Sequence, residues 1–355
     1  MSDAATINGG TPPDAGPKKT KEPRNTRITQ QTLPACKPVL EPIWVVFIFL
    51  AMGVVLVPIG GVCLYYGMKP YEVGTRYDQT CLPNMTNSQR ESYILQVGDN
   101  SLSCTVALRI EEDMAAPVYV YYELRGYYQN HRRYVKSRSD MQLANEPKNQ
   151  ATSLCDPQEF LNGNSSELIN PCGLVAWSFF NDTYAVSARF GRVLLPISDE
   201  GIAFESDIKY RFANYTPEYF NPTLNSNRGG FNLSSTSGGA TPKENQRFMN
   251  WMRLSALPTF RKLWGIINQD LKSGDTVTIT VYNRYNTYKF DGQKSIVLGT
   301  TTWLGGYNPF LGIAFLVTGG LSFVMAVVYM ALRIAKPRKF GDPSALSFNK
   351  PAGSG

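Results

Sequence analysis

Two long segments without a charged side chain interrupt an otherwise polar chain, at residues 43–66 and 310–332. At 1.5 Å per residue such helices are about 35 Å long, which exceeds the roughly 30 Å hydrocarbon thickness of a bilayer. A soluble core helix of this length rarely lacks a charge, so we predict two transmembrane helices. The first starts too far from Met1 and is too long for a cleavable signal peptide, and we expect it to remain as an anchor.

Alternating apolar and polar positions predict strands in the central segment, with Val118, Val120, Tyr122 and Leu124 on one strand face. Similar patterns occur in CTVALRI, in DTVTITVYNRYNTY and in KSIVLGTTTW. The best helical pattern is NQRFMNWMRLSALPTFRKLWGIINQ, which we interpret as two short helices divided at Pro258. We expect a β-rich α+β ectodomain that resembles an antiparallel β-sandwich, with a long loop at residues 220–242 and a disordered tail over the first 40 residues.

Basic side chains gather on the outer side of each apolar segment. They are Lys18, Lys19, Lys21, Arg24, Arg27 and Lys37 before the first, and Arg333, Lys336, Arg338 and Lys339 after the second. Because positive charge resists translocation, both ends should be cytosolic. We therefore expect an integral membrane protein with tails at 1–42 and 333–355 and a lumenal or extracellular ectodomain at 67–309. That ectodomain holds 24 basic and 23 acidic residues, so the formal charge of +7 resides mostly in the tails.

Four of the six cysteines, Cys81, Cys104, Cys155 and Cys172, lie in the ectodomain, as expected of disulfides in an oxidising compartment. Three connectivities are possible, and the shortest loops favour Cys81 with Cys104 and Cys155 with Cys172, each contributing roughly 3 kcal/mol. Asparagine glycosylation triplets also fall only in this part, at Asn84, Asn164, Asn181, Asn214 and Asn232. The triplets alone are weak evidence, and they support a lumenal or extracellular position only because the charge and cysteine arguments indicate the same position.

The stretch YYQNHRRYVKSR, residues 127–138, combines aromatic and basic side chains in a way that favours nucleic-acid binding. An ectodomain outside the cytosol meets almost no nucleic acid, so we exclude that function. Gly126 permits a turn, which leaves this basic strip on a strand edge or loop. It is then either a solvated or internally salt-bridged surface, or a contact for acidic loops of a partner protein.

Signatures of catalysis are missing from the sequence. The single histidine, His131, rules out a HExxH helix or a two-histidine zinc site, and neither a P-loop nor a G-x-S-x-G elbow occurs. We predict no catalytic residue, no metal site and no cofactor. Glycines and one alanine recur every seven residues within or beside the two apolar segments, at Gly53, Gly60, Gly67 and at Gly312, Gly319, Ala326. Because glycine is common in membrane helices, these stripes fit chance, mutual packing of the two helices or docking to a larger membrane protein.

Several strings resemble one family: NTRITQQTLPACKP, VYVYYELRGYYQNHRRYVKSRSD, PCGLVAWSFFNDTY, NWMRLSALPTFRKLWG and KSIVLGTTTWLGGYNPFLGIAFLV. They are similar to the cell cycle control protein 50 family, also called ligand-effect modulator or ALA-interacting subunits. Members are the non-catalytic β subunits of type IV P-type ATPases, the phospholipid flippases. The resemblance extends from about Asn25 to Lys339.

The resemblance implies a 1:1 heterodimer with an ATPase α subunit, which binds ATP and Mg²⁺ and moves phospholipid to the cytosolic leaflet. It also implies a role in folding, export from the endoplasmic reticulum and activity of that subunit, in the endoplasmic reticulum, the Golgi and endosomal system and the plasma membrane. The family's two disulfides in sequential order would be Cys81–Cys104 and Cys155–Cys172, and Asn181 would be the first candidate for a glycan.

Two sets of candidate partner-binding residues follow. The resemblance implies a tail contact within residues 27–37, and the basic strip supplies an ectodomain contact. The candidates are Arg27, Gln30, Gln31, Leu33 and Pro34 in the tail, and Tyr128, His131, Arg132, Arg133, Tyr134, Lys136 and Arg138 in the strip.

Two other classes of protein share parts of this organisation. Subunits of two-span ligand-gated channels have the same topology, but here the second span offers only Thr318, Ser322 and Tyr329 as polar groups for a conduction path. A lumenal glycan-processing enzyme would need paired carboxylates in a cleft, for which residues 111–113 are the candidates.

Overall fold

The computed structural model describes residues 26–33, 42–97, 103–145, 152–188, 191–220 and 241–337. Pro34, Asn232 and nearly all of the expected 220–242 loop lie outside these ranges, as does most of the expected disordered tail. The chain divides into two compact units, Met52–Leu321 and the combination of Met1–Ala51 with Ser322–Gly355.

Both apolar segments are helical. Helix α1 spans Pro42–Met68, one residue before and two residues after the expected segment, and α9 spans Phe310–Ala335, three residues beyond its expected end. Their mean hydropathies are 2.7 and 2.3, and both are long and apolar enough to cross a membrane. Proline stands at the first position of α1, and the Asn308 side chain accepts a hydrogen bond from the Phe310 N–H at the start of α9 (3.0 Å).

Glycines of α1 and α9 lie against the opposite helix. A Cβ atom at Gly60 would lie 2.9 Å from the Leu316 backbone nitrogen, and one at Gly319 would lie 2.8 Å from the Val57 side chain. Gly312 likewise faces the backbone of Leu64. Gly60, Gly312 and Gly319 therefore serve mutual packing of the two helices, which was one of the interpretations of the stripes.

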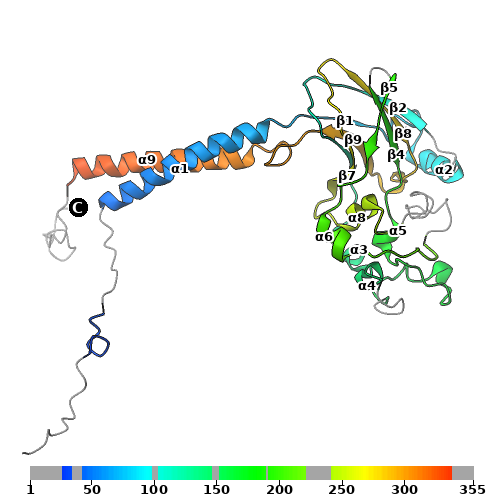
Figure 1. Cartoon of the computed structure of the whole chain (residues 1–355), viewed down its shortest axis with the longest axis horizontal. Helices are drawn as coiled ribbons and strands as arrows, with labels where there is room; N and C mark the ends of the chain where they lie inside the picture. Colours follow the sequence, from blue (N-terminus) through cyan, green and yellow to red (C-terminus); the bar gives the residue numbers. More distant parts are fainter. Residues whose placement is uncertain are drawn as a thin grey trace, which may run out of the picture. The chain divides into compact units, whose positions relative to one another are not determined.

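Two antiparallel sheets form the domain between the two apolar helices, which we call the central domain (Figure 1). The first has the order β1-β9-β3-β7-β6, with β1 at Glu72–Arg76, β9 at Gln293–Gly299, β3 at Val118–Arg125, β7 at Thr259–Ile267 and β6 at Ile197–Ser198. The second has the order β2-β8-β4-β5, with β2 at Ser103–Arg109, β8 at Thr276–Tyr282, β4 at Thr183–Ala188 and β5 at Val193–Leu195. This confirms the expected β-rich antiparallel domain between two apolar helices.

Short helices complete the central domain, and Figure 1 shows α3, α4, α5, α6 and α8 gathered at one end of the sheets. They are α2 at Asn87–Val97, α3 at Arg132–Lys136, α4 at Asp140–Leu143, α5 at Leu174–Trp177, α6 at Glu205–Tyr210 and α8 at Gln246–Met252, with 3-10 turns η1 at Leu161–Gly163 and η2 at Tyr288–Phe290. The apolar side chains Phe248, Met249 and Trp251 of α8 are fully buried and extend the core beyond the sheets.

The strand predictions hold where alternation was regular. In β3, Val118, Val120, Tyr122 and Leu124 are all buried, as expected. CTVALRI and KSIVLG form most of β2 and β9, and the first half of the 275–288 pattern forms β8. The regular alternation of β-branched and aromatic residues with polar ones sufficed to identify these strands.

The prediction of a second helix after Pro258 is wrong, because Thr259–Ile267 forms strand β7. Its buried side chains Phe260, Trp264 and Ile267 are spaced four and three residues apart, as on one face of a helix, which is why the sequence pattern suited a helix. The strand pairs with β3 along its whole length and with β6 at its end. Pairing with residues more than 100 positions away outweighs a local pattern that suits a short helix about as well.

Lysine 262 of β7 caps the end of α8. Its Nζ donates hydrogen bonds to the carbonyl oxygens of Asn250 (3.1 Å) and Arg253, which have no partner within the helix. Burial, with a smaller effect from the Arg253 cation, lowers the pKa of Lys262 from 10.5 to about 8. Strand β7 therefore holds the C-terminal end of α8, the helix that precedes it in the sequence.

The packing of α1 on α9 predicts different effects for two glycines of the same helix. Gly312→Leu should lower the unfolding temperature of the detergent-solubilised protein, because overpacking costs roughly 1–3 kcal/mol. Gly320→Leu is the matched control, since nothing lies within 4 Å of a Cβ atom there. Equal unfolding temperatures for the two variants would contradict the packing.

The lowered pKa of Lys262 predicts a pH dependence of stability. Between pH about 8 and 10.5 the unfolded chain binds more protons at this lysine than the folded chain does, so stability rises with pH across that window. Burial of the charged Lys262 amine lowers the free energy of unfolding by at most about 3 kcal/mol. This destabilisation is complete below pH 8 and absent above pH 10.5. Denaturant unfolding of wild type and Lys262→Met at several pH values measures it: the difference in unfolding free energy should change across the window, and a constant difference would refute the assignment.

Candidate docking surface and its supports

The basic strip begins with a turn and continues as a short helix. Strand β3 ends at Arg125, Gly126 adopts φ +76°, and Arg132–Lys136 form α3. The N–H of Val135 donates to the His131 carbonyl (3.0 Å), and the N–H of Ser137 donates to the Tyr134 carbonyl (3.1 Å). The expected turn is present, whereas the expected strand edge or loop is in part a helical turn, because this turn points Tyr134 into the core.

Two tyrosines anchor the strip from inside. The Tyr127 ring lies 5.7 Å from that of Trp251 and 5.5 Å from that of Phe290. The Tyr134 hydroxyl is hydrogen-bonded to Ser178 Oγ (2.7 Å), and burial raises the pKa of Tyr134 well above 10. The Tyr134 ring is partly buried and packs against the core, so it supports the surface from below. Its contact with a partner stays a prediction.

Five side chains point outward and form what we call the basic face: Tyr128, His131, Arg132, Arg133 and Lys136, all exposed. The side chains of Arg132, Arg133 and Lys136 make no ion pair or hydrogen bond with any residue in the described part of the chain. Arg138 differs, since its Nε lies 3.4 Å from Asp140 Oδ1 and it donates to the Met252 carbonyl. The internally salt-bridged interpretation therefore applies to Arg138 and not to the basic face.

An apolar side chain borders the basic face. Leu257 is 66% exposed at the tip of the loop that precedes β7. Hydrogen bonds hold this loop against the strip: Asn130 Nδ2 donates to the Ala256 carbonyl (2.9 Å), and the Ser255 N–H donates to Gln129 Oε1 (3.0 Å). Sequence reasoning missed Leu257 because about 130 residues separate it from the strip and no local pattern connects them.

The disulfide Cys155–Cys172 supports the far end of the strip. Ser137, directly after α3, donates from Oγ to the Cys155 carbonyl (3.1 Å) and accepts from the Leu174 N–H (2.9 Å). Gly173 has φ +103°, and a Cβ atom there would collide with the Ser137 carbonyl. The disulfide, the glycine and the serine therefore fix α3 against the loop that the disulfide closes.

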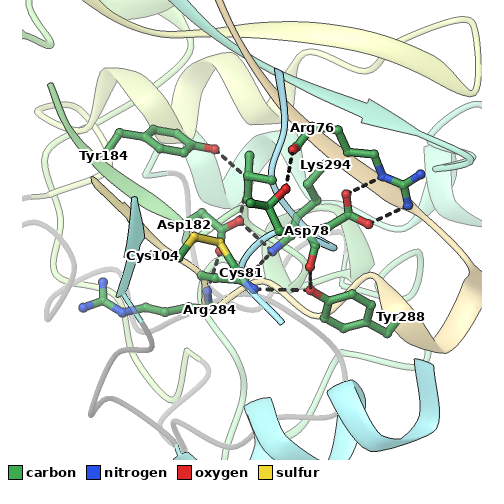
Figure 2. The surroundings of a disulfide bond; sticks show 12 residues. Arg76, Asp78, Cys81, Cys104, Asp182, Tyr184, Arg284, Tyr288 and Lys294 are labelled. Atoms are coloured by element: carbon green, nitrogen blue, oxygen red, sulfur yellow. Dashed lines mark hydrogen bonds and ion pairs between the residues drawn. A yellow bond between two sulfur atoms is a disulfide. The ribbon is translucent and has the colours of Figure 1, made fainter. Parts of the chain in front are cut away.

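The disulfide Cys81–Cys104 borders a buried polar network, shown in Figure 2. Both disulfides thus have the pairing that the shortest loops favour. In the network, Asp182 Oδ2 accepts from Lys294 Nζ and from the Tyr77 hydroxyl, both at 2.7 Å. Asp182 Oδ1 accepts the backbone N–H groups of Arg284 and Tyr285, both at 2.6 Å. Asp182 and Lys294 are completely buried.

Lysine 294 uses its remaining hydrogens on the turn after β8. Its Nζ donates to the Tyr285 carbonyl (2.6 Å) and to Asn283 Oδ1. Burial lowers the pKa of Lys294, and the charge of Asp182 opposes that effect. Nearby, Arg76 and Asp78 form a second ion pair at 2.6 Å, and Tyr288 donates to the Asp78 carbonyl (Figure 2). The network ties strands of both sheets to one turn.

The glycosylation triplets differ in exposure. Asn84, Asn164 and Asn214 are exposed, whereas Asn181 is only 7% exposed, and its Oδ1 is buried without a hydrogen-bond partner in the described chain. Occupancy of these sites stays a prediction.

In the tail unit, residues 26–33 form a turn with Thr32 N–H donating to the Arg27 carbonyl (2.8 Å). Arg27, Gln30, Gln31 and Leu33 are all exposed there. Their role in binding a partner stays a prediction.

The carboxylates considered for a glycan-processing enzyme occupy an exposed stretch at residues 111–113. Asp113 accepts a hydrogen bond from the Ser273 N–H (2.8 Å), and this bond, with the nearby Lys272, lowers the pKa of Asp113. A general acid needs a raised pKa, so this carboxylate does not suit that role. Among the described residues, no group of three or more His, Cys, Asp or Glu side chains could hold a metal ion.

Comparisons with known proteins identify similar chains over almost the full length. The model of the LEM3 (ligand-effect modulator 3) family / CDC50 family matches residues 63–339. ALA-interacting subunit 3 of Arabidopsis thaliana is 42% identical over 359 residues, covering 99% of this chain and 98% of the relative. Cell cycle control protein 50A of Mus musculus is 33% identical over 348 residues, covering 92% and 93% of the two chains.

The buried network predicts a large cost for removing one partner. Lys294→Met leaves the Asp182 carboxylate buried without its charge partner, and the free energy of unfolding should fall by roughly 3–5 kcal/mol. Lys272→Met is the matched control, because its ion pair with Asp113 is exposed on both sides and should contribute little. Chemical unfolding of both variants measures the effect. A Lys294→Met protein as stable as the control would show that the network does not hold the sheets together.

Proposed function

Because the chain belongs to the LEM3 (ligand-effect modulator 3) / CDC50 family, we propose that it is the non-catalytic β subunit of a type IV P-type ATPase, a phospholipid flippase. The family expected from the sequence strings is thereby confirmed. Relatives named ALA-interacting subunits carry a name that specifies a protein partner. Within the structure, the basic face is the observation that supports the proposal. The unpaired cations Arg132, Arg133 and Lys136 lie on α3, which Tyr134 and Ser137 hold against the core.

In this proposal the ATPase α subunit performs the chemistry. It binds ATP and Mg²⁺, hydrolyses the nucleotide and moves phospholipid from the exoplasmic to the cytosolic leaflet. The chain described here forms a 1:1 heterodimer with it, supports its folding, its exit from the endoplasmic reticulum and its activity, and needs no cofactor of its own. The partners are this ATPase and membrane lipids, with no nucleic acid.

The proposed topology places both tails in the cytosol and the ectodomain in the lumen or outside the cell. The two apolar helices, the basic flanks and the two disulfides support it. The complex would reside in the endoplasmic reticulum, the Golgi and endosomal system and the plasma membrane, with N-linked glycans on the ectodomain.

The chain contacts the ATPase at two surfaces, one on the exoplasmic side and one on the cytosolic side. The basic face meets acidic exoplasmic loops of the ATPase, while Leu257 beside it supplies apolar area. On the cytosolic side, Arg27, Gln30, Gln31, Leu33 and Pro34 contact the ATPase's cytosolic domains. Exposed Ile28 and Leu33 in this turn, 72% and 56% exposed, offer apolar groups for that contact.

No observation favours the two alternatives. For a channel, Thr318 would have to line a pore, but its hydroxyl donates to the Ala314 carbonyl of its own helix (2.8 Å). For a glycan-processing enzyme, the lowered pKa of Asp113 opposes acid catalysis. Mild detergent extraction followed by mass determination separates the three classes: a complex with a large ATPase supports the proposal, and a homotrimer or a monomer would refute it.

The basic face predicts a salt-dependent loss of binding. The triple variant Arg132→Gln/Arg133→Gln/Lys136→Gln should capture the ATPase about 3-fold to 100-fold less well at low salt, because exposed charge pairs contribute roughly 0.2–1 kcal/mol each. Added salt should bring wild type toward the variant, since it screens the pairs that the variant lacks.

The control for this experiment removes equal charge elsewhere. Arg192→Gln/Lys243→Gln/Lys272→Gln replaces three exposed cations outside the strip. It should bind like wild type, and the unfolding temperatures of both triple variants should match that of wild type. If the basic-face variant captured the ATPase as well as wild type does at every salt concentration, the basic face would not be the contact.

A further inference from the structure

The chain passes from β9 into α9 through a tight turn at residues 302–305, which we call the tryptophan turn. Thr302 and Gly305 exchange two backbone hydrogen bonds of 2.9 Å, and Gly305 adopts φ +109°. Trp303 and Leu304 therefore stand at the tip of the turn. The Trp303 side chain is 68% exposed, so the turn presents its ring outside the core.

Hydrogen bonds hold the tryptophan turn against the end of α1. Thr302 Oγ1 donates to the Tyr66 carbonyl (3.1 Å), and the Asn308 N–H donates to the Gly67 carbonyl (2.9 Å). Both carbonyls belong to the last turn of α1, where no later helical N–H can reach them. Gly67 permits this approach, since a Cβ atom there would lie 2.5 Å from the Asn308 carbonyl oxygen. The turn therefore has a fixed position on the helix end.

The length of α1 determines how deep the Trp303 ring lies in a bilayer. Its apolar part, Ile43–Met68, has 26 residues. This length corresponds to about 39 Å, which exceeds the hydrocarbon thickness by about 9 Å, so the helix ends reach the headgroup layers. The ring centres of Trp303 and Tyr66 are 5.7 Å apart, and Tyr66 is in the last turn of α1. The indole is therefore at headgroup depth, although it belongs to the turn after β9.

The side chains around Trp303 suit a lipid interface. Four further apolar or aromatic side chains at the junction of the helices with the central domain are each more than half exposed: Tyr65, Met68, Tyr307 and Phe310. No charged residue occurs between Lys294 and Arg333, so neither the turn nor the start of α9 carries a group that resists contact with lipid. Tyrosine and tryptophan concentrate at membrane interfaces, because their rings are apolar while their O–H and N–H groups stay hydrated. Exposed Lys69 follows α1 directly, and its long side chain can reach lipid phosphates.

A simpler interpretation treats the tryptophan turn only as a cap of α1, with Trp303 in water. Capping requires the hydrogen bonds of Thr302 and Asn308, and it gives no reason for a group of exposed apolar side chains around the junction. Apolar patches of this kind mark contact with a membrane or with another protein. The depth of the Trp303 ring beside the last turn of α1 favours the membrane.

We propose that the tryptophan turn is a lipid-binding anchor: the Trp303 indole lies in the headgroup layer of the exoplasmic leaflet and fixes the central domain to the bilayer surface. This inference rests on the topology in the proposed function, but on no contact with the ATPase. Residues 69–71 alone join α1 to β1, so a second attachment at the turn restricts tilting of the central domain. The basic face is then held at a constant height above the bilayer.

Tryptophan fluorescence of the full-length protein in phosphatidylcholine nanodiscs tests the proposal. Of the five tryptophans, Trp177, Trp251 and Trp264 are at most 5% exposed, whereas Trp44, near the start of α1, is exposed like Trp303. A Trp44→Phe background therefore leaves Trp303 as the one tryptophan that quenchers reach. Subtracting the emission of the Trp44→Phe/Trp303→Phe variant isolates the Trp303 signal.

Brominated lipids and aqueous iodide report opposite surroundings, because each quenches only the tryptophans that it touches. Trp303 should lose more than half of its emission when the lipid carries bromine near the carbonyl end of its acyl chains. The loss should be smaller when the bromine is near the methyl end, since the headgroup layer is closer to the carbonyl end. Iodide should have little effect on Trp303.

Leu257→Trp in the Trp44→Phe/Trp303→Phe background is the matched control. Leu257 is 66% exposed, as much as the tryptophan of the turn, but it precedes β7, which begins beside Arg125, whereas β9 ends beside Tyr119. Arg125 is six residues after Tyr119 in β3, or about 20 Å along the strand. Iodide should quench the introduced tryptophan, and brominated lipid should not.

Three results would overturn the proposal: a Trp303 that brominated lipid does not quench, stronger quenching of Trp303 by bromine near the methyl end, or equal lipid quenching in the Leu257→Trp control. The first would leave the turn as a cap of α1 outside the lipid. A chain that does not insert into the nanodisc would overturn the proposed topology as well. Because the nanodiscs contain no ATPase, a failure to capture the ATPase would refute the proposed function without changing these results.

Discussion

The buried ion pair between Asp182 and Lys294 is the interaction on which the arrangement of the two sheets depends. Either charge alone would cost several kcal/mol to remove from water. Here the cost is offset because each group uses its full hydrogen-bonding capacity: Asp182 accepts four bonds and Lys294 donates three. Lys294 belongs to β9 of one sheet and Asp182 precedes β4 of the other, so the pair fixes their relative position, and the Cys81–Cys104 bond lies beside it.

The rigidity of this centre extends to the docking surface through aromatic contacts. Phe180, next to Asn181, stacks on Tyr122 with ring centres 3.9 Å apart, and Tyr285 donates its hydroxyl hydrogen to the Ser178 carbonyl (2.8 Å). Ser178 also holds Tyr134, which anchors α3. A packed core thus holds the backbone that carries the cations of α3. A partner that binds them therefore loses little conformational entropy of that backbone.

Local patterns in the sequence predicted much of the fold, because they report which side chains face a core. Strand β3, both apolar helices and the short disulfide loops follow from alternation, length and spacing. Strand β7 was mistaken for a helix, since nine residues hold little periodicity and its identity depends on pairing with β3. The inward orientation of Tyr134, the exposed Leu257 and the burial of Asn181 depend on contacts between distant residues, and no local pattern encodes such contacts.

The distribution of paired and unpaired cations connects the fold to the proposed role. Lys294, Arg261 and Arg253 have carboxylate partners at 2.5–2.7 Å, and these pairs join separate elements of the central domain. Arg132, Arg133 and Lys136 have no such partner in the described chain, although neighbouring Arg138 has one. Exposed cations need no internal partner to remain solvated, so leaving them unpaired has little effect on stability. Because these cations are unpaired, their electrostatic potential attracts an approaching acidic surface. Complementary charge then accelerates association and favours one orientation of the partner. The fold thus uses paired charge to hold itself together and keeps unpaired charge for the surface that a partner would meet.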